Sequence, residues 1–172
     1  MKAENRREAI LELLQKSLSP ISAAALAKEY GVSRQVVVGD VALLRALGHE
    51  ISATPRGYVL ERDTGMLLRT VATIHSSEDT KAELDIIVDN GCTVKDVIVE
   101  HPIYGQLTGS LELKSRYDVN QFLLRSAECE AQPLSSLTDG MHLHTLLCPD
   151  EDSYKRVVED LRAAGFLFET EE

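Results

Sequence analysis

Four of the five histidines in this 172-residue chain lie after residue 70, and they are its best candidates for metal chemistry. His142 and His144 stand two positions apart in a segment with the pattern of a strand, so both rings should project from one face. Two imidazoles on one face form half of a site for a transition metal ion. The fifth histidine, His49, has no comparable neighbour and is expected to be an ordinary surface residue.

Two further residues would complete such a site. His75 ends an earlier predicted strand, and Glu83 follows eight residues later within a predicted helix. If that helix packs over the sheet beside the strand of His142 and His144, three imidazoles and one carboxylate meet. This set suits zinc, nickel, iron or cobalt, and the ligand types alone do not choose among them. The alternative is that His142 and His144 form a hydrogen-bonded surface pair that holds no metal.

The elements that must position these side chains alternate along the second part of the chain. Polar caps and glycines separate apolar segments whose periodicity changes between that of a strand and that of a helix. The pattern predicts strands over residues 67–74, 94–99, 107–113 and 142–148, and helices over residues 76–89, 116–126 and 151–164. The order β-α-β-β-α-β-α predicts an α+β domain with a mainly antiparallel sheet and helices on one face.

The first part of the chain has the pattern of a helix-turn-helix. An alanine-rich helix is expected over residues 22–30, and Gly31 supplies the positive φ that ends it. Ser33 is then a suitable N-cap for a second helix. That helix has one apolar stripe for the core, formed at i, i+4 and i+7 by Val37, Val41 and Leu44.

The start of this second helix is expected to contact DNA. Ser33, Arg34, Gln35 and Val38 lie off the apolar stripe, at or near the helix N-terminus. Helix-turn-helix proteins present the side chains at this end of the recognition helix to base edges. The four residues are therefore the candidate DNA contacts of the helix.

A short hairpin is predicted behind the second helix. Residues 49–54 alternate like a strand, residues 55–57 form a turn, and residues 58–60 return as a second strand. A hairpin in this position is a wing, and Arg56 at its tip would meet phosphate or the minor groove. The alternative is a small helical domain whose hairpin only packs against its own core.

Charge divides the chain into two parts. The composition, 44% apolar and 27% charged, is that of a soluble globular protein, and the net charge is −10. Residues 1–62 have nine basic and seven acidic side chains, whereas residues 63–172 have nine basic and twenty-one acidic ones. We therefore expect a winged helix-turn-helix domain over 1–62 and an acidic domain over 66–172 that faces away from phosphate.

Targeting and cysteine patterns point to an ordinary intracellular protein. The sequence shows no signal peptide and no hydrophobic span, so a cytoplasmic location and no membrane partner are expected. Cys92, Cys129 and Cys148 lie far apart and are expected to be buried free thiols, without a disulfide framework.

Motifs in both domains resemble one known family. Residues 33–35, 44–45 and 53–58 look like the biotin-repressor-type helix-turn-helix. The second domain resembles the three-histidine (3H) domain at residues 86–91, 96–105 and 134–144. In this order, and over nearly the whole chain, the two domains resemble the NiaR family of nicotinic-acid-responsive repressors.

The resemblance implies a function and its partners. It implies a homodimeric repressor, and no enzyme, that binds double-stranded operator DNA at genes for NAD synthesis or niacin uptake. Nicotinic acid is the implied co-repressor, and the implied second domain is similar to the phosphocarrier HPr fold. One divalent transition metal ion per chain is implied at the positions that match the same four side chains, His75, Glu83, His142 and His144.

The resemblance also suggests how the effector binds. A pyridine nitrogen of nicotinate would complete the coordination of the metal ion. His101, Tyr104 and Arg116 are the candidate effector contacts; the alternative role of His101 and Tyr104 is to fix a tight turn. Gly39 departs from the family pattern, because related recognition helices usually have a polar residue there, and this affects the operator sequence.

Two other functions remain open on the sequence alone. Three histidines and a glutamate would suit a metal-dependent hydrolase, although no separate general base stands out and a fused DNA-binding domain favours sensing. The second alternative is a regulator for which the metal ion itself is the effector. Operator binding with metal alone, and then with metal plus nicotinate, separates this case from the first.

Overall fold

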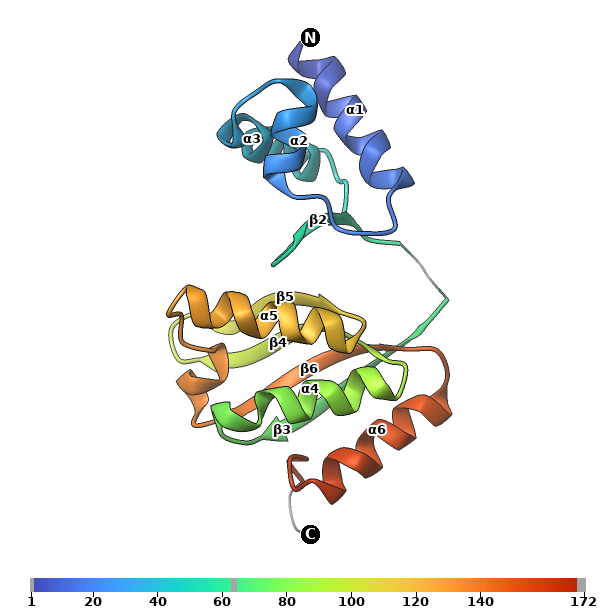
Figure 1. Ribbon diagram of the computed structural model, residues 1–172, viewed down its shortest axis with the longest axis vertical. Helices are drawn as coiled ribbons and strands as arrows, with labels where there is room; N and C mark the ends of the chain where they lie inside the picture. The colour runs from blue at the N-terminus through green and yellow to red at the C-terminus, as the bar shows by residue number, and fades with distance from the viewer. Residues whose placement is uncertain (1, 63–64, 170–172) are drawn as a thin grey trace. The chain divides into compact units, whose positions relative to one another are not determined.

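The computed structural model describes residues 2–62 and 65–169 and divides the chain into two units, Met1–Asp63 and Thr64–Glu172 (Figure 1). The first unit is a helix-turn-helix with a two-stranded hairpin, and the second is a four-stranded sheet with helices. The prediction of an α+β chain with a mainly antiparallel sheet is confirmed. Each unit has a hydrophobic core of its own.

The first unit contains three helices and the predicted hairpin. Gly31 ends the second helix with φ 63°, and the Ser33 side chain caps the third by accepting from the backbone N–H of Val36. An N-terminal helix, for which the sequence analysis made no prediction, packs Ile10 and Leu14 into the same core. The elements are α1 (Ala3–Lys16), α2 (Ala23–Tyr30), α3 (Arg34–Ala46), β1 (Ile51–Thr54) and β2 (Gly57–Leu60).

Two charged anchors hold this unit together. The buried carboxylate of Asp40, in α3, accepts from Nε and Nη2 of Arg6, in α1, at 2.6 and 3.2 Å. The guanidinium of Arg62 donates to backbone carbonyls at the end of α1, among them those of Leu14 and Ser17. Carbonyls at a helix C-terminus lack intrahelical donors, so a cation there is stabilising. The recognition helix and the end of the wing are both tied to α1.

Removal of the Asp40 carboxylate should destabilise the first unit. Asp40→Ala would leave Arg6 and Arg7, both half-buried in α1 and both within 4 Å of the Asp40 carboxylate, without this shared partner. A charge that loses its partner in a protein interior is costly. We expect the thermal midpoint of the first unit to fall by several degrees in calorimetry. Glu12→Ala, which breaks an exposed ion pair with Lys16 in the same helix, should leave the midpoint nearly unchanged. Equal effects of the two changes would contradict this account.

The second unit follows the predicted β-α-β-β-α-β-α order. Its sheet has the strand order β3-β6-β4-β5, and every pairing between neighbours is antiparallel. Two short 3-10 helices precede α4 and β6. The elements are β3 (Leu67–Ile74), η1 (Ser77–Asp79), α4 (Thr80–Asp89), β4 (Thr93–His101), β5 (Gly105–Leu113), α5 (Arg116–Glu128), η2 (Leu134–Thr138), β6 (Met141–Cys148) and α6 (Glu151–Ala163).

The three helices of this unit pack on one face of the sheet (Figure 1). The core beneath them is made of Leu84, Ile87, Val119, Val157 and Leu161 from the helices and Val71, Val94, Leu111, Leu113 and Leu146 from the strands. Side chains alternate between faces along β6, so His142 and His144 point to the helical side and are buried with Leu146. The strand therefore directs both imidazoles towards α4.

The expectation of three buried thiols is wrong for one cysteine. Cys92 and Cys148 are buried and free, but Cys129 is exposed because it lies just past the last turn of α5. In the described part of the chain, every helix is too short or too polar to cross a bilayer.

Candidate metal and effector site

Three histidines meet one carboxylate between β3, α4 and β6. Oε2 of Glu83 lies 2.6 Å from Nε2 of His75, and Oε1 lies 3.2 Å from Nε2 of His142 and 3.3 Å from Nε2 of His144. All four side chains are at most 3% exposed. The structure thus brings together the four residues that the sequence analysis selected.

The orientation of each imidazole is set by its other nitrogen. Nδ1 of His75 lies 2.7 Å from the carbonyl of Ser76, Nδ1 of His142 lies 2.8 Å from that of Gly140, and Nδ1 of His144 lies 2.6 Å from that of Asp96. A backbone carbonyl only accepts hydrogen bonds, so all three Nδ1 atoms carry protons. In the neutral tautomers, the three Nε2 lone pairs are then directed at Glu83.

With neutral imidazoles, the negatively charged Glu83 carboxylate would face three Nε2 lone pairs and no positive charge. Oε1 of Glu83 and Nε2 of His144 are buried and have no hydrogen-bond partner among the described residues. Buried polar atoms are rarely left in this state, so an ion or bound protons must satisfy them. A divalent cation held by Nε2 donors whose Nδ1 atoms donate to carbonyls fits the donor set of transition-metal sites.

Without a cation, the cluster draws protons. Burial alone would lower the pKa of His75 and His144, but the adjacent Glu83 carboxylate outweighs it and raises both pKa values. Burial alone would raise the pKa of Glu83, but the charge of His144 and the adjoining imidazoles of His142 and His75 hold it well below its ordinary value. The metal-free cluster is therefore an ion-paired group of imidazolium and carboxylate.

Gly140 brings the two strands of the cluster together, and the sequence analysis did not name it. A Cβ at Gly140 would lie 2.3 Å from the backbone oxygen of His75, and the residue has φ 91°. Only glycine allows this approach, which places the end of β3 against the start of β6. Gly140 follows Asp139, and an Asp-Gly pair is typical of a turn, so the sequence could have indicated this position.

A pocket opens beside the cluster. It has a volume of about 330 Å³ and includes His75 in its wall, so a small molecule within it would lie next to the cluster. That volume is within the usual range for small-molecule sites. The wall is rich in hydroxyl groups and consists of His75, Ser76, Ser77, Ser135, Ser136, Asp139 and Gly140.

The effector contacts suggested by the sequence lie outside this pocket. His101 accepts with Nδ1 from the backbone N–H groups of Ile103 and Tyr104, as expected of a residue that fixes the β4–β5 turn. Tyr104 is 72% exposed. Arg116 pairs with Asp89 at the start of α5. The serines that line the pocket come instead from two segments that are far apart in sequence, the start of η1 and the η2 helix.

The candidate DNA contacts lie on one side of α3 and in the wing. Arg34, Gln35 and Val38 are exposed in the first turns of α3, with Ser33 at its N-cap, and Arg56 lies half-buried in the β1–β2 turn. Gly39 is exposed too, and a Cβ there would have no atom within 4 Å. Packing within the chain therefore does not require glycine at this position.

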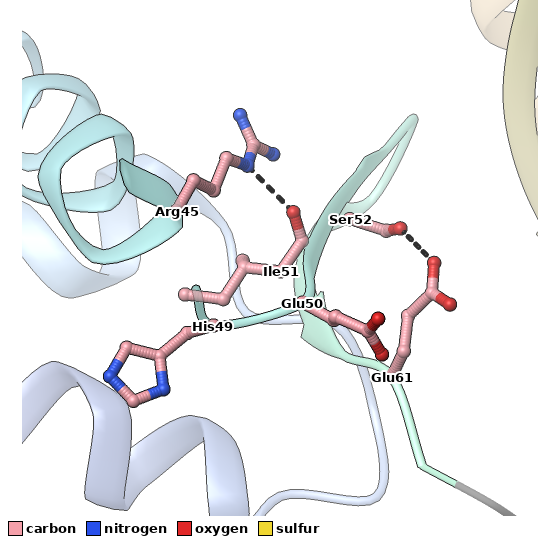
Figure 2. Close-up of a pocket in the computed structure, with 6 residues that line it drawn as sticks. All are labelled: Arg45, His49, Glu50, Ile51, Ser52 and Glu61. Carbon is pink, nitrogen blue, oxygen red and sulfur yellow. Dashed lines mark hydrogen bonds between the residues drawn. The ribbon is translucent and has the colours of Figure 1, made fainter. Parts of the chain in front are cut away.

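A second pocket lies at the opposite end of α3 (Figure 2). Arg45 donates to the carbonyl of Ile51 at 2.6 Å, and the Ser52 hydroxyl donates to Glu61 at 2.6 Å. His49 lines this pocket without a second histidine or cysteine beside it. This arrangement lacks the donor set of the cluster in the second unit.

Loss of one imidazole should separate metal binding from folding. His142→Ala removes a ligand donor from β6, and we expect the metal content of the purified protein to fall sharply in elemental analysis. The second unit should stay folded, because its core is independent of the cluster. His101→Ala, which removes a histidine of the same unit outside the cluster, should retain full metal content. Full metal occupancy in His142→Ala would show that His142 is not a ligand.

Comparisons with known proteins agree with this architecture. The model of the 3H domain matches residues 68–170, and a model of a helix-turn-helix domain matches residues 6–59. The chain is 43% identical to the probable transcription repressor NiaR of Thermotoga maritima, over 96% of this chain and 95% of that protein. It is also 43% identical to the transcription repressor NadR of Bacillus subtilis, over 95% of this chain and 93% of that protein.

The fold and the relatives together define a class. A helix-turn-helix unit followed by a 3H domain is the arrangement of a DNA-binding transcription repressor, and the regulator is not an enzyme. Within that class, the chain belongs to the NiaR family of transcription repressors.

Proposed function

We propose that this repressor controls genes of NAD synthesis or niacin uptake and that nicotinic acid is its co-repressor. The effector binds at or beside one divalent transition metal ion held by the four-residue cluster of His75, Glu83, His142 and His144. The repressor acts as a homodimer on double-stranded operator DNA.

The observation that carries this proposal is the set of three fixed imidazoles. Each Nδ1 donates to a backbone carbonyl, so each Nε2 faces Glu83. His75, Glu83 and His142 each offer a ligand atom within 4.8 Å of the others, and Nε2 of His144 lies 3.3 Å from Oε1 of Glu83. The hydrogen-bonded surface pair that the sequence left open does not need this arrangement. When bound, the ion would supply positive charge to an acidic domain, where an anionic effector otherwise finds little attraction.

The pocket beside His75 supports the choice of a small effector. An aromatic acid in this pocket has the cluster at one end and the hydroxyls of Ser77 and Ser135 as candidate donors for its carboxylate. The hydroxyls of Ser76 and Ser136 already donate to Asp79 and to the carbonyl of Pro133. To act as a co-repressor, the molecule must bind the DNA-competent state better than the other state. Closure of the two segments that line the pocket would give such a difference.

Operator binding with a panel of pyridine metabolites tests this proposal. The metal-loaded protein is titrated onto a DNA fragment from the gene region that it controls, with nicotinate, nicotinamide or pyridine-2-carboxylate present. We expect nicotinate to raise the operator affinity most. The same affinity with and without every member of the panel would refute nicotinate co-repression.

The second candidate function is a metal sensor. The cluster favours it, because the buried Oε1 of Glu83 and Nε2 of His144 have no hydrogen-bond partner among the described residues and would be satisfied by a cation without an organic ligand. Metal alone would then give the full rise in operator affinity. Nicotinate would add nothing to it. The titration above therefore also decides between the two effectors, if it is repeated with metal-free protein.

Metal binding should strengthen as pH rises, in opposition to the stability of the metal-free cluster. The His75 and His144 pairings contribute stability below the ordinary histidine pKa of 6.5 and lose it as pH rises through their raised pKa values. Glu83 contributes above its ordinary pKa of 4.5 and loses that contribution as pH falls through its lowered pKa. The metal-free pairing is therefore strongest between about pH 4.5 and 6.5.

A cation must displace the imidazole protons. We expect its stabilisation in thermal melts to be small at a pH near 5.5 and to grow towards pH 8, with proton release seen in calorimetry in buffers of different ionisation enthalpy. A metal affinity independent of pH over this range would show that the histidines are not the ligands.

A further inference from the structure

Strands β3 and β6 have apolar side chains on both faces of the sheet. Their inner positions, among them Val71, His144 and Leu146, are buried under the helices. Their outer positions lack charge, although an antiparallel sheet with one face in water normally has polar side chains there. The outer residues lie opposite one another in four pairs, Leu68 with Leu147, Thr70 with Thr145, Ala72 with Leu143 and Ile74 with Met141.

We name these eight residues the β3–β6 face. Leu68 is 56% exposed, Ile74 41% and Met141 38%. None of the eight belongs to either hydrophobic core of the described residues, and α4, α5 and α6 all lie on the other side of the sheet. Ile98 of β4, in register with Leu143, continues the apolar surface. Contiguous apolar surface of this kind on a soluble protein marks an interaction site.

Charge indicates what covers this face. Residues 63–172 have nine basic and twenty-one acidic side chains, so two copies of this unit repel each other over most of their surfaces. The β3–β6 face has no charged residue, so two copies can bring these faces together without opposing like charges. Apolar sheet faces pack on each other in a nearly aligned arrangement, and a twofold axis uses the same patch on both partners.

We infer that a second copy of this chain packs its own β3–β6 face against this one, sheet on sheet about a twofold axis. This inference rests on the proposed function, because two recognition helices at a fixed separation are what a twofold operator requires. It also assigns two tasks to β6. His142 and His144 point to the cluster, while the residues between and beside them, Met141, Leu143 and Thr145, contact the partner.

The N-terminal unit of the same chain is a poorer occupant. Its exposed large apolar side chains are few among the described residues. Leu18 lies between α1 and α2, and the others, Val36, Val38, Leu43 and Leu47, lie on α3 or at its end. If it covered the β3–β6 face with α3, it would hide the surface that contacts DNA. A chain folded in that way would be monomeric and would not bind an operator until it opened.

Sedimentation of the full-length chain tests the inference. Leu68→Glu puts a charge in place of a large apolar side chain of the face that is 56% exposed, and we expect the dimer dissociation constant to rise by about a hundredfold or more. Leu124→Glu is the matched control, because Leu124 is 57% exposed on α5, on the opposite side of the sheet. It should leave the dimer intact. Metal content should match the wild type in both variants. The thermal midpoint should fall only in Leu68→Glu, because a dissociated dimer loses the stabilisation that association gives.

A second variant tests whether dissociation of the dimer depends on the face and not on Leu68 alone. Thr70→Arg adds charge at an exposed position of the same face, and it should dissociate the dimer in the same way. A wild-type chain that is monomeric would overturn the inference, as would a dimer that persists in both variants. A monomeric wild type whose operator affinity rises on Leu68→Glu would overturn it too, and would identify the N-terminal unit as the occupant.

The outcomes also separate this inference from the proposed function. A dimer that Leu68→Glu dissociates, in a protein that responds to no pyridine acid, would refute nicotinate co-repression and support the contact. A nicotinate-responsive repressor that remains dimeric in Leu68→Glu would refute the contact alone.

Discussion

Removal of the metal ion is expected to abolish nicotinate binding, and restoring the ion should recover it. The second unit is acidic, and the cluster is the place where a cation would attract an anionic ligand to the pocket beside His75. A three-histidine, one-carboxylate set leaves a position open on a five- or six-coordinate ion, and a pyridine nitrogen is a donor of suitable type for it. Calorimetry on metal-free, reloaded and wild-type protein measures the effect.

Two variants sharpen this experiment. Glu83→Gln should weaken the nicotinate response by lowering metal affinity, although Glu83 itself is buried behind the imidazoles. His101→Ala should leave it unchanged, because that histidine bonds to its own turn. Nicotinate that binds metal-free protein with undiminished affinity would rule out coordination and leave the ion a purely structural role.

Operator discrimination is expected to disappear when Arg34 and Gln35 are both replaced by alanine. Both side chains are exposed in the first turn of α3 and have no role in its core. Bidentate contacts of arginine to guanine and of glutamine to adenine are worth about 1–3 kcal/mol of discrimination each. A footprint on operator and on unrelated DNA should show similar, weak protection for the double variant.

A control keeps this result specific. Lys155→Ala also removes one positive charge, from an exposed position of α6 in the second unit, and it should leave the footprint unchanged. The dimer and the metal content of the double variant should match the wild type. Unchanged operator preference in the Arg34 and Gln35 variant would show that another surface reads the DNA.

The sequence predicted those features that depend on local pattern. The boundaries of β3 match their prediction. The cap Ser33 was predicted because a serine directly before an apolar helical stripe accepts hydrogen bonds from the first backbone N–H groups of the helix. His75 and Glu83 were paired because only a turn and the start of a helix separate them. By contrast, α1 was not predicted, although Ile10 and Leu14 stand one turn apart in its sequence.

Non-local contacts explain what the sequence analysis did not find. The carbonyl of Asp96 that orients His144 depends on a shift of register between β4 and β6, which no local pattern gives. The serines of the pocket come together because Gly140 lets two segments approach each other. Arg116 was chosen for its charge, but that charge is already matched by Asp89.

The hydrogen bonds from Arg62 to the end of α1 determine which element of the first unit bears a load applied to the chain at Arg62. Because the Arg62 guanidinium donates to backbone carbonyls at the end of α1, a load that reaches Arg62 is passed to α1. The Asp40–Arg6 pair then passes it to the recognition helix, without bending the hairpin. The helix-turn-helix should thus turn as one stiff body.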